Sequence, residues 1–303
     1  AINSPPLNDW LAYSSLVAQS LFENAARITL TQLVPRIAIS YTLAVRYTSD
    51  LTDAEWQHLD DCFPKPSKKG RRRKHPFREL LNAIFSQVRT GCQWRNLPKD
   101  FAPWCTVYHY FRCWKRKGLW NPMHPHLREH LRWVEGRKPQ PRAAIIDRQS
   151  VTSSETSAER GYDAGKKING RKRHLLVDTL GLVLRGMVLP ANIQDRDEAK
   201  RLRADFFSQR TRRRVQHIWA DGGDPGTLLT SARQLWRGTV EIVKRSELHP
   251  FKGLPRRWVV ERTFGWLGRD RRLSRDYERQ ATTGETMVYL AMIRLMLARL
   301  GKA

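Results

Sequence analysis

The chain has 303 residues, which is enough to bury a sizeable core and suggests two folded units. Hydrophobic residues make up 40% of it, which argues against a disordered chain. Its 55 Lys and Arg residues against 29 Asp and Glu residues give a formal charge of +26, which favours a polyanionic partner. Because no lipid-binding segment accompanies this charge, we expect the partner to be nucleic acid rather than a membrane.

The cysteines and the apolar stretches bear on where the protein works. The four cysteines lie in the first half of the chain and form no CxxC pair, so a zinc ribbon is not expected. The apolar stretch MVYLAMIRLMLARL near the C-terminus is interrupted by Arg294 and is short for a membrane span. These features predict a cytoplasmic protein.

Residues 1–45 differ from the rest because they are apolar and nearly uncharged. They lack the basic start and the small-residue cleavage site of a secretory signal. Polar breaks and Pro35 also argue against a membrane span. We treat this segment as an N-terminal extension of unknown role.

A small all-α domain is predicted over residues 46–135. Thr52 and Glu55 form a capping box before a short first helix. Apolar spacing predicts three more helices, which begin at about 77, 104 and 122, with Gly91 ending the first of these and Gly118 the second. Such a unit resembles a helix-turn-helix domain, in which one helix enters the major groove of DNA.

Two groups of basic residues in this domain are candidate DNA contacts. The first is the tract KPSKKGRRRKHP, whose like charges stay extended unless phosphates neutralise them. The second closes the helix that begins at 104, whose aromatic residues we interpret as core. A solvated linker explains the tract equally well. The candidates are Lys68, Lys69, Arg71, Arg72, Arg73, Lys115 and Arg116.

Residues 136–142, GRKPQPR, read as a proline-bearing linker before a second domain over 143–303. AAIIDRQSV is predicted to be a buried strand, and KRHLLVDTLGLVLRGMVLP a hairpin that turns at Asp178 to Gly181. The later elements are a helix at about 195–207, the strand RVQHIWAD, a helix at about 227–236, the strand TVEIV and two final helices. This order predicts an α/β fold of the ribonuclease H-like plan, a mixed sheet with helices on both faces.

The last of these helices is predicted to begin at a capping box of Thr282 and Glu285 and to end at Gly301. Its apolar surface fits either the core or a dimer seam, and we favour the core.

Three acidic residues each close an apolar run: Asp147, Asp221 and Glu261. If they converge on one sheet edge, they repel one another unless divalent cations bridge them. Oxygen ligands suit Mg²⁺ or Mn²⁺, so the pattern predicts two such ions held by this triad for phosphoryl transfer. Arg257, one helical turn before Glu261, is expected to orient its carboxylate or contact a phosphate. Taken singly, the aspartates are better explained as solvated caps, and the alternative for Arg257 with Glu261 is an ordinary surface ion pair.

The stretch GKKINGRKRH is predicted to be a flexible loop beside this site. Its basic residues could clamp the phosphates of the strand that is cut, although a solvated charge run is the plain alternative. They are Lys166, Lys167, Arg171, Lys172 and Arg173.

Several motifs in order resemble the DDE transposases of bacterial insertion sequences, in the insertion-sequence-five group. They are GYDAGKKINGRKRHLLVDTLGL, ANIQDRD, WADGG and RRWVVERTFGWLGRDRRLSRDYE, preceded by RYTSDLTDAEWQHL and RTGCQWRNLPKDF. The resemblance covers about residue 46 to the end. It implies a nucleoid-associated bacterial enzyme that cleaves double-stranded DNA at the element's inverted repeats and joins it to target DNA, with the three acids as its triad and several copies in the active complex. A silent DNA-binding descendant and a nuclease that does not join strands stay as alternatives.

Overall fold

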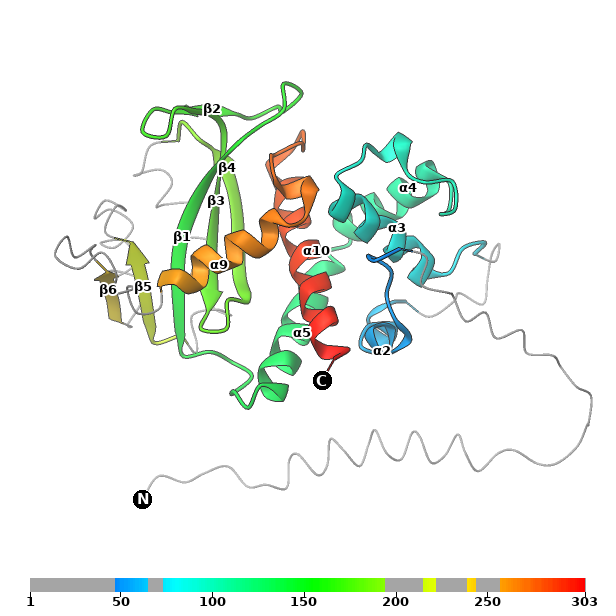
Figure 1. Cartoon of the computed structure of the whole chain (residues 1–303), viewed down its shortest axis with the longest axis horizontal. Helices are drawn as coiled ribbons and strands as arrows, with labels where there is room; N and C mark the ends of the chain where they lie inside the picture. Colours follow the sequence, from blue (N-terminus) through cyan, green and yellow to red (C-terminus); the bar gives the residue numbers. More distant parts are fainter. Residues whose placement is uncertain (1–46, 65–72, 194–214, 222–238, 244–256, 303) are drawn as a thin grey trace, which may run out of the picture. The chain divides into compact units, whose positions relative to one another are not determined.

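A computed structural model of the chain describes residues 47–64, 73–193, 215–221, 239–243 and 257–302 (Figure 1). The predictions for residues 1–45, for the tract from Lys68 to Arg72 and for the helices at 195–207 and 227–236 lie outside these residues. Val45–Ala303 form one compact unit. The boundary at 136–142 between two predicted domains stays a prediction.

Helices make up the first part of this unit. They are α2 (Asp53–Gln57), α3 (Phe77–Thr90), α4 (Trp104–Arg116) and α5 (Trp120–Val134), with 3₁₀ turns at Asp60–Cys62 and Trp94–Asn96. The capping box is confirmed, since the Thr52 hydroxyl accepts from the Glu55 N–H and the Glu55 carboxylate from the Thr52 N–H. The end of α3 is confirmed too: Gly91 has φ of 72°, a left-handed conformation that glycine adopts at little cost.

Six strands form one sheet among the described residues: β1 (Ala143–Thr152), β2 (Gly161–Asp163), β3 (Ile168–Asp178), β4 (Val183–Pro190), β5 (His217–Asp221) and β6 (Thr239–Val243). Their order is β2-β3-β1-β5-β6, and β4 pairs with the same strand β3. The hairpin-linked strands are antiparallel, whereas β1, β5 and β6 run parallel. The predicted mixed sheet is therefore confirmed.

The turn between β3 and β4 lies where the sequence predicts it. The Asp178 carboxylate accepts the N–H groups of Leu180 and Leu182, both at 2.9 Å, and Gly181 has φ of 83°. The other Asp178 oxygen is 2.5 Å from Arg132 of α5, and both side chains are buried. Asp178 is thus a turn residue that also ties α5 to the sheet.

The prediction of a flexible loop over GKKINGRKRH is wrong for most of its length. Gly161–Asp163 and Ile168–Asp178 pair as antiparallel strands, so only the short turn between them is irregular. Gly170 faces the neighbouring strand so closely that a Cβ there would lie 2.0 Å from the Val151 carbonyl oxygen. Because charged residues are uncommon in strands, the sequence of this segment does not predict a strand that pairs on both sides.

Two helices complete the unit, α9 (Arg257–Gly268) and α10 (Ala281–Leu300), with the 3₁₀ turn Arg271–Leu273 between them. In Figure 1, α9 crosses the sheet in front of β1. The helix α10 packs against β4, α3 and α5. One hydrophobic core therefore runs from α3 through α10 to the sheet. The helix α10 is core, as predicted. No helix in the described part of the chain is both long and apolar enough to cross a membrane.

The predicted capping box of this helix is wrong. Gln280 is the N-cap and makes no side-chain cap hydrogen bond. The Glu285 carboxylate instead accepts the N–H of Val188 at 3.0 Å and so holds α10 against β4.

Candidate catalytic site and basic surfaces

Two of the three predicted acids come to the same level of the sheet. In the parallel pair of β1 and β5, Ile145 lies opposite Trp219 and Ile146 opposite Ala220. The next residue on each strand is Asp147 and Asp221, and adjacent strands lie about 4.8 Å apart. Because positions alternate between the two faces, both aspartates belong to the face that carries Ile145 and Trp219.

The third acid lies on the helix that covers this face. Val259 and Val260 of α9 are buried in the same core as Ile145 and Trp219. Glu261 follows directly and is exposed. Arg257 begins α9 one turn earlier, and its side chain lies outside the described residues. The fold thus brings all three acidic positions to one side of the sheet, the aspartates from adjacent strands and the glutamate from the helix above.

Local contacts fix the strands that carry the aspartates. Asp147 is half-buried, and one of its carboxylate oxygens accepts the Arg148 N–H at 2.7 Å. On the neighbouring strand the Trp219 indole donates to Glu241 of β6 at 2.9 Å, and His217 lies 3.0 Å from the same carboxylate. Sequence reasoning missed Glu241, although its odd position within TVEIV places it on the same face as Trp219.

The chemistry of the donors suits hard divalent cations. Carboxylate oxygens are what Mg²⁺ and Mn²⁺ bind, and paired carboxylates are held together most easily by cations between them. Among the side chains that the structure describes, no three His, Cys, Asp or Glu gather into a metal site. The Asp221 side chain is not among them, so the number and kind of ions stay a prediction.

Comparison with known families decides what kind of protein this is. Residues 138–296 match the model described as "Transposase DDE domain", and residues 51–124 match "Putative transposase of IS4/5 family". The chain belongs to the DDE transposases of the IS4/5 type. A DDE domain implies a ribonuclease H-like fold, in agreement with the mixed sheet.

A curated relative matches part of this transposase-family chain. It is the insertion element IS402 uncharacterized 16.2 kDa protein of Burkholderia cepacia, 30% identical over 90 residues. The alignment spans 27% of this chain and 60% of that protein.

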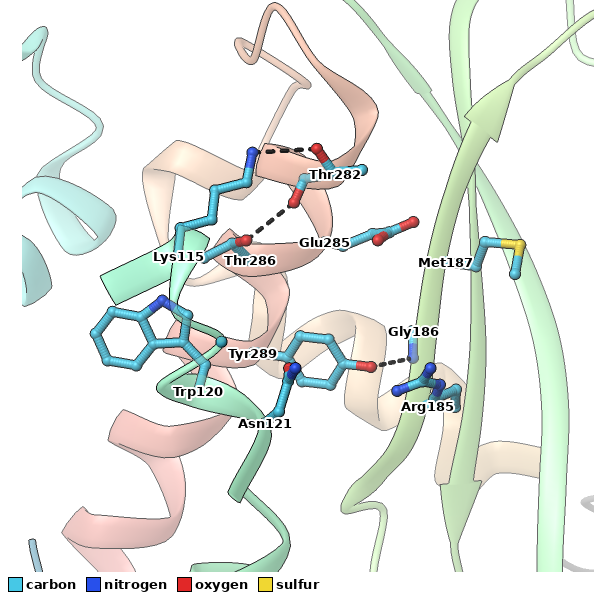
Figure 2. A pocket seen from close by; sticks show the side chains of 11 residues that line it. Lys115, Trp120, Asn121, Arg185, Gly186, Met187, Thr282, Glu285, Thr286 and Tyr289 are labelled. Atoms are coloured by element: carbon cyan, nitrogen blue, oxygen red, sulfur yellow. Dashed lines mark hydrogen bonds between the residues drawn. The ribbon is translucent and has the colours of Figure 1, made fainter. Parts of the chain in front are cut away.

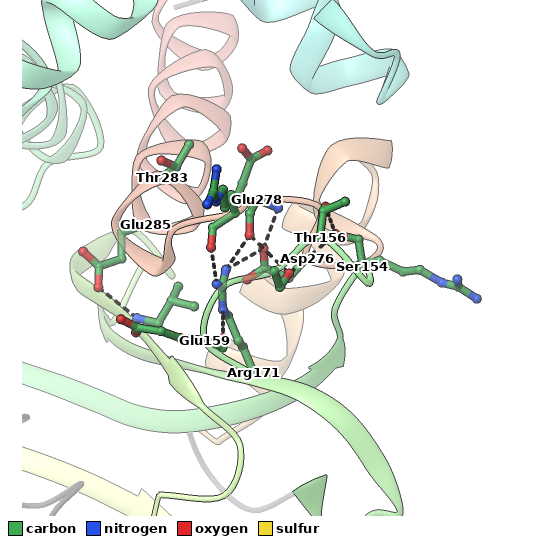
Figure 3. Close-up of polar contacts among 12 residues, drawn as sticks. Ser154, Thr156, Glu159, Arg171, Asp276, Glu278, Thr283 and Glu285 are labelled. Carbon is green, nitrogen blue, oxygen red and sulfur yellow. Dashed lines mark hydrogen bonds and ion pairs between the residues drawn. The ribbon is translucent and has the colours of Figure 1, made fainter. Parts of the chain in front are cut away.

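The prediction that Arg171 contacts DNA is wrong, because its side chain is 0% exposed. Its guanidinium donates to the carbonyl oxygens of Glu159, Glu278 and Arg279 at 2.6 to 2.8 Å and lies 3.3 Å from Asp276 (Figure 3). Arg171 therefore holds the segment before α10 onto β3.

Arg173 has the same structural role as Arg171, and the prediction that it contacts DNA is also wrong. It is 2% exposed and donates to the carbonyl oxygens of Leu273 and Arg275 at 2.6 and 3.0 Å. Burial lowers the pKa of its guanidinium. Lys172, on the other face of β3, is 8% exposed, and its DNA contact stays a prediction. A sequence shows a charge run but not which charges turn inward.

The other basic candidates reach the surface where the structure describes them. Lys166 and Lys167 are exposed in the turn between β2 and β3. Arg73 is exposed and stacks 3.4 Å over the Phe77 ring. Lys115 and Arg116, at the end of α4, line a groove that also contains aromatic rings.

Proposed function

We propose that this chain binds the terminal inverted repeats of an insertion sequence, cleaves DNA there and joins the cut ends to target DNA. The observation that carries the proposal is the register of β1 and β5, which sets Asp147 and Asp221 at one level beneath the helix that bears Glu261. Membership of the DDE transposases supports the same activity.

In this proposal the triad holds two divalent cations, Mg²⁺ or Mn²⁺. When bound, such ions stabilise charge on the attacking and leaving oxygens of an in-line displacement at phosphorus. Asp147 contributes a carboxylate whose orientation is set by the Arg148 N–H. Arg257 orients Glu261 or meets a phosphate, and the exposed Lys166 and Lys167 hold the backbone of the DNA near the sheet.

The proposed partners are double-stranded DNA, as element ends and as target, and further copies of the chain in the active complex. The strong positive charge supports the DNA partner, because Lys and Arg supply most of the affinity for phosphates. Because its proposed substrate is DNA in a bacterial cell, we also propose that the protein is associated with the nucleoid.

Cleavage of labelled element-end DNA by the purified chain in Mg²⁺ or Mn²⁺ tests the proposal. We expect Asp147→Asn and Glu261→Gln to abolish cutting while duplex affinity stays near that of the native chain. Glu155→Gln changes an exposed carboxylate outside the site and should cut normally. Cutting retained in either triad variant refutes the assignment. A native chain that binds without nicking is a silent DNA-binding descendant, and one that nicks without joining is a nuclease.

A further inference from the structure

The surface between α4 and the segment 272–283 is a groove of about 1150 Å³. One wall is the outer side of α4, with Trp104, Tyr108 and Arg112. Arg272 and Arg279 lie on the opposite wall. We propose that this groove binds an unpaired strand of DNA, such as one separated at an element end, which rests on the proposed function and specifies its substrate.

Aromatic rings line the groove at positions that bases could reach. Trp104 is 38% exposed at the first residue of α4, and Tyr108 follows one turn later on the same side of the helix. Trp94 also lines the groove and packs against Tyr108 with ring centroids 5.3 Å apart. In a duplex, each base already stacks on its neighbours. Only an unpaired strand can offer base faces to these rings.

Arginines stand beside the same rings. The Arg95 guanidinium lies 5.5 Å from the Trp104 ring centroid, and that of Arg112 lies 5.8 Å from the Tyr108 ring. Each cation is therefore near enough to a stacked base to meet the phosphate that follows it. A groove that alternates rings and cations is typical of binding to single strands without sequence preference.

The charge of the groove fits a polyanion. Of the lining residues that the structure describes, Glu278 is the acid, and its carboxylate is 2.7 Å from Arg272 and 8% of the residue is exposed. That pair is neutral overall, which leaves the exposed Arg112, Arg116 and Arg279 as excess positive charge. Phosphates following the groove would meet cations along its length.

The wall opposite α4 is fixed relative to the candidate catalytic strands. Arg171 and Arg173 of β3 bind the carbonyl oxygens of residues 273–279, and β3 pairs along its length with β1, which carries Asp147. Lys115 closes the inner end of the groove, where its ammonium group donates to Thr283 at 2.6 Å and Thr282 at 3.1 Å. The groove is thus a formed feature held from both walls.

A smaller cavity of about 270 Å³ lies on the other side of Lys115, among α5, β4 and α10 (Figure 2). Two of its polar groups are already in use within the fold: the Tyr289 hydroxyl accepts the Gly186 N–H at 3.1 Å, and Glu285 accepts the Val188 N–H. We therefore assign the unpaired DNA strand to the groove between α4 and the segment 272–283.

Fluorescence anisotropy with the full chain tests the groove, using a labelled oligothymidylate and a labelled duplex of equal length in EDTA. Stacking on an aromatic side chain contributes about 1–3 kcal/mol per base, so Trp104→Ala should weaken oligothymidylate binding about 5- to 150-fold. Duplex affinity should stay nearly unchanged. Trp133→Ala is the matched control, because Trp133 is 68% exposed on α5 and does not line the groove.

The cations are tested by the salt dependence of the same binding. Arg112→Gln should lower the slope of log affinity against log salt by about 0.7, the contribution of one phosphate contact on a single strand. Arg137→Gln removes an exposed arginine outside the groove and should leave the slope unchanged.

The results separate this inference from the proposed function. Equal affinities of Trp104→Ala and Trp133→Ala for oligothymidylate overturn the groove, and so does an equal loss of duplex and single-strand binding in Trp104→Ala. Because binding is measured without divalent cations, the expected losses support the groove even for a chain that never cuts. Conversely, a chain that cuts normally but shows no effect of Trp104→Ala keeps its proposed activity and loses the groove.

Discussion

Replacing Arg171 by methionine should destabilise the fold and leave DNA contacts untouched. Arg171 and Asp276 have side chains that are 0% and 1% exposed, so the substitution leaves a buried carboxylate without its cation. Removing one partner of a buried ion pair costs about 3–5 kcal/mol. The carbonyl oxygens of Glu159, Glu278 and Arg279 lose a donor as well, which places the expected loss toward the upper end.

Urea unfolding measures this loss. With a denaturant dependence of about 2–3 kcal/mol per molar, the midpoint of Arg171→Met should fall by about 1–2.5 M. Arg160→Met is the matched control, since Arg160 is an exposed arginine beside the same segment and its loss should change stability by at most about 0.5 kcal/mol. Adding Asp276→Leu to Arg171→Met should restore part of the stability, because the buried charge is then gone.

Duplex binding by the folded Arg171→Met chain completes the test. We expect it to match that of Arg160→Met. If Arg171→Met instead unfolds at the native midpoint and loses DNA affinity, Arg171 faces the DNA and the buried cluster is refuted.

Three further changes have measurable outcomes. Gly181→Ala should lower the free energy of unfolding by about 2–4 kcal/mol, because φ is +83° and a Cβ would lie 2.8 Å from the Thr263 hydroxyl. Gly136→Ala, with φ of +68° and nothing within 4 Å of the added Cβ, should lower it by only about 1–2 kcal/mol. Equal losses in thermal unfolding would contradict this packing. Burial, with the nearby cations, lowers the pKa of His174 from 6.5 to about 3, so the unfolded chain takes up the proton first. Stability therefore falls by about 1.4 kcal/mol per pH unit as the pH drops from about 6.5 to about 3. In urea titrations His174→Gln should flatten that dependence by one proton, and an unchanged slope would show that His174 is not its source. EDTA should stop cleavage, and Mg²⁺ or Mn²⁺ should restore it; cutting in EDTA would rule out the metal-dependent mechanism.

Elements with local signals were predictable from the sequence. The capping box of Thr52 and Glu55 and the left-handed Gly91 depend on residues three or four positions apart. The turn at Asp178 is likewise closed by the next few N–H groups. Because such contacts lie within one turn of chain, the sequence contains all that determines them.

Features that depend on distant partners were not predictable. Thr282 and Glu285 have the spacing of a capping box, yet Glu285 binds the Val188 N–H of β4 because tertiary packing offers that donor. In the sequence, Arg171 and Arg173 look like part of a solvated charge run, whereas in the fold residues 273–279 cover them. A solvated run of arginines and a buried one have the same pattern of charge in the sequence, and only the fold distinguishes them.

The candidate site lies between these extremes. A right-handed crossover predicts that the strands carrying Asp147 and Asp221 are neighbours, and β1 and β5 are paired in this way. The groove beside α4 was missed because aromatic residues at helical spacing are typical of a core. Phe111 and Trp114 are buried as that pattern predicts, whereas Trp104 is not.

The position of α10 bears on how this protein can be made. Its 20 residues pack against α3, α5 and β4. A nascent chain cannot close its core while this helix is still inside the ribosome, since until then the apolar sides of the earlier elements have nothing to cover them. We expect a stop codon ahead of residue 281 to yield an aggregating product rather than a smaller, working one.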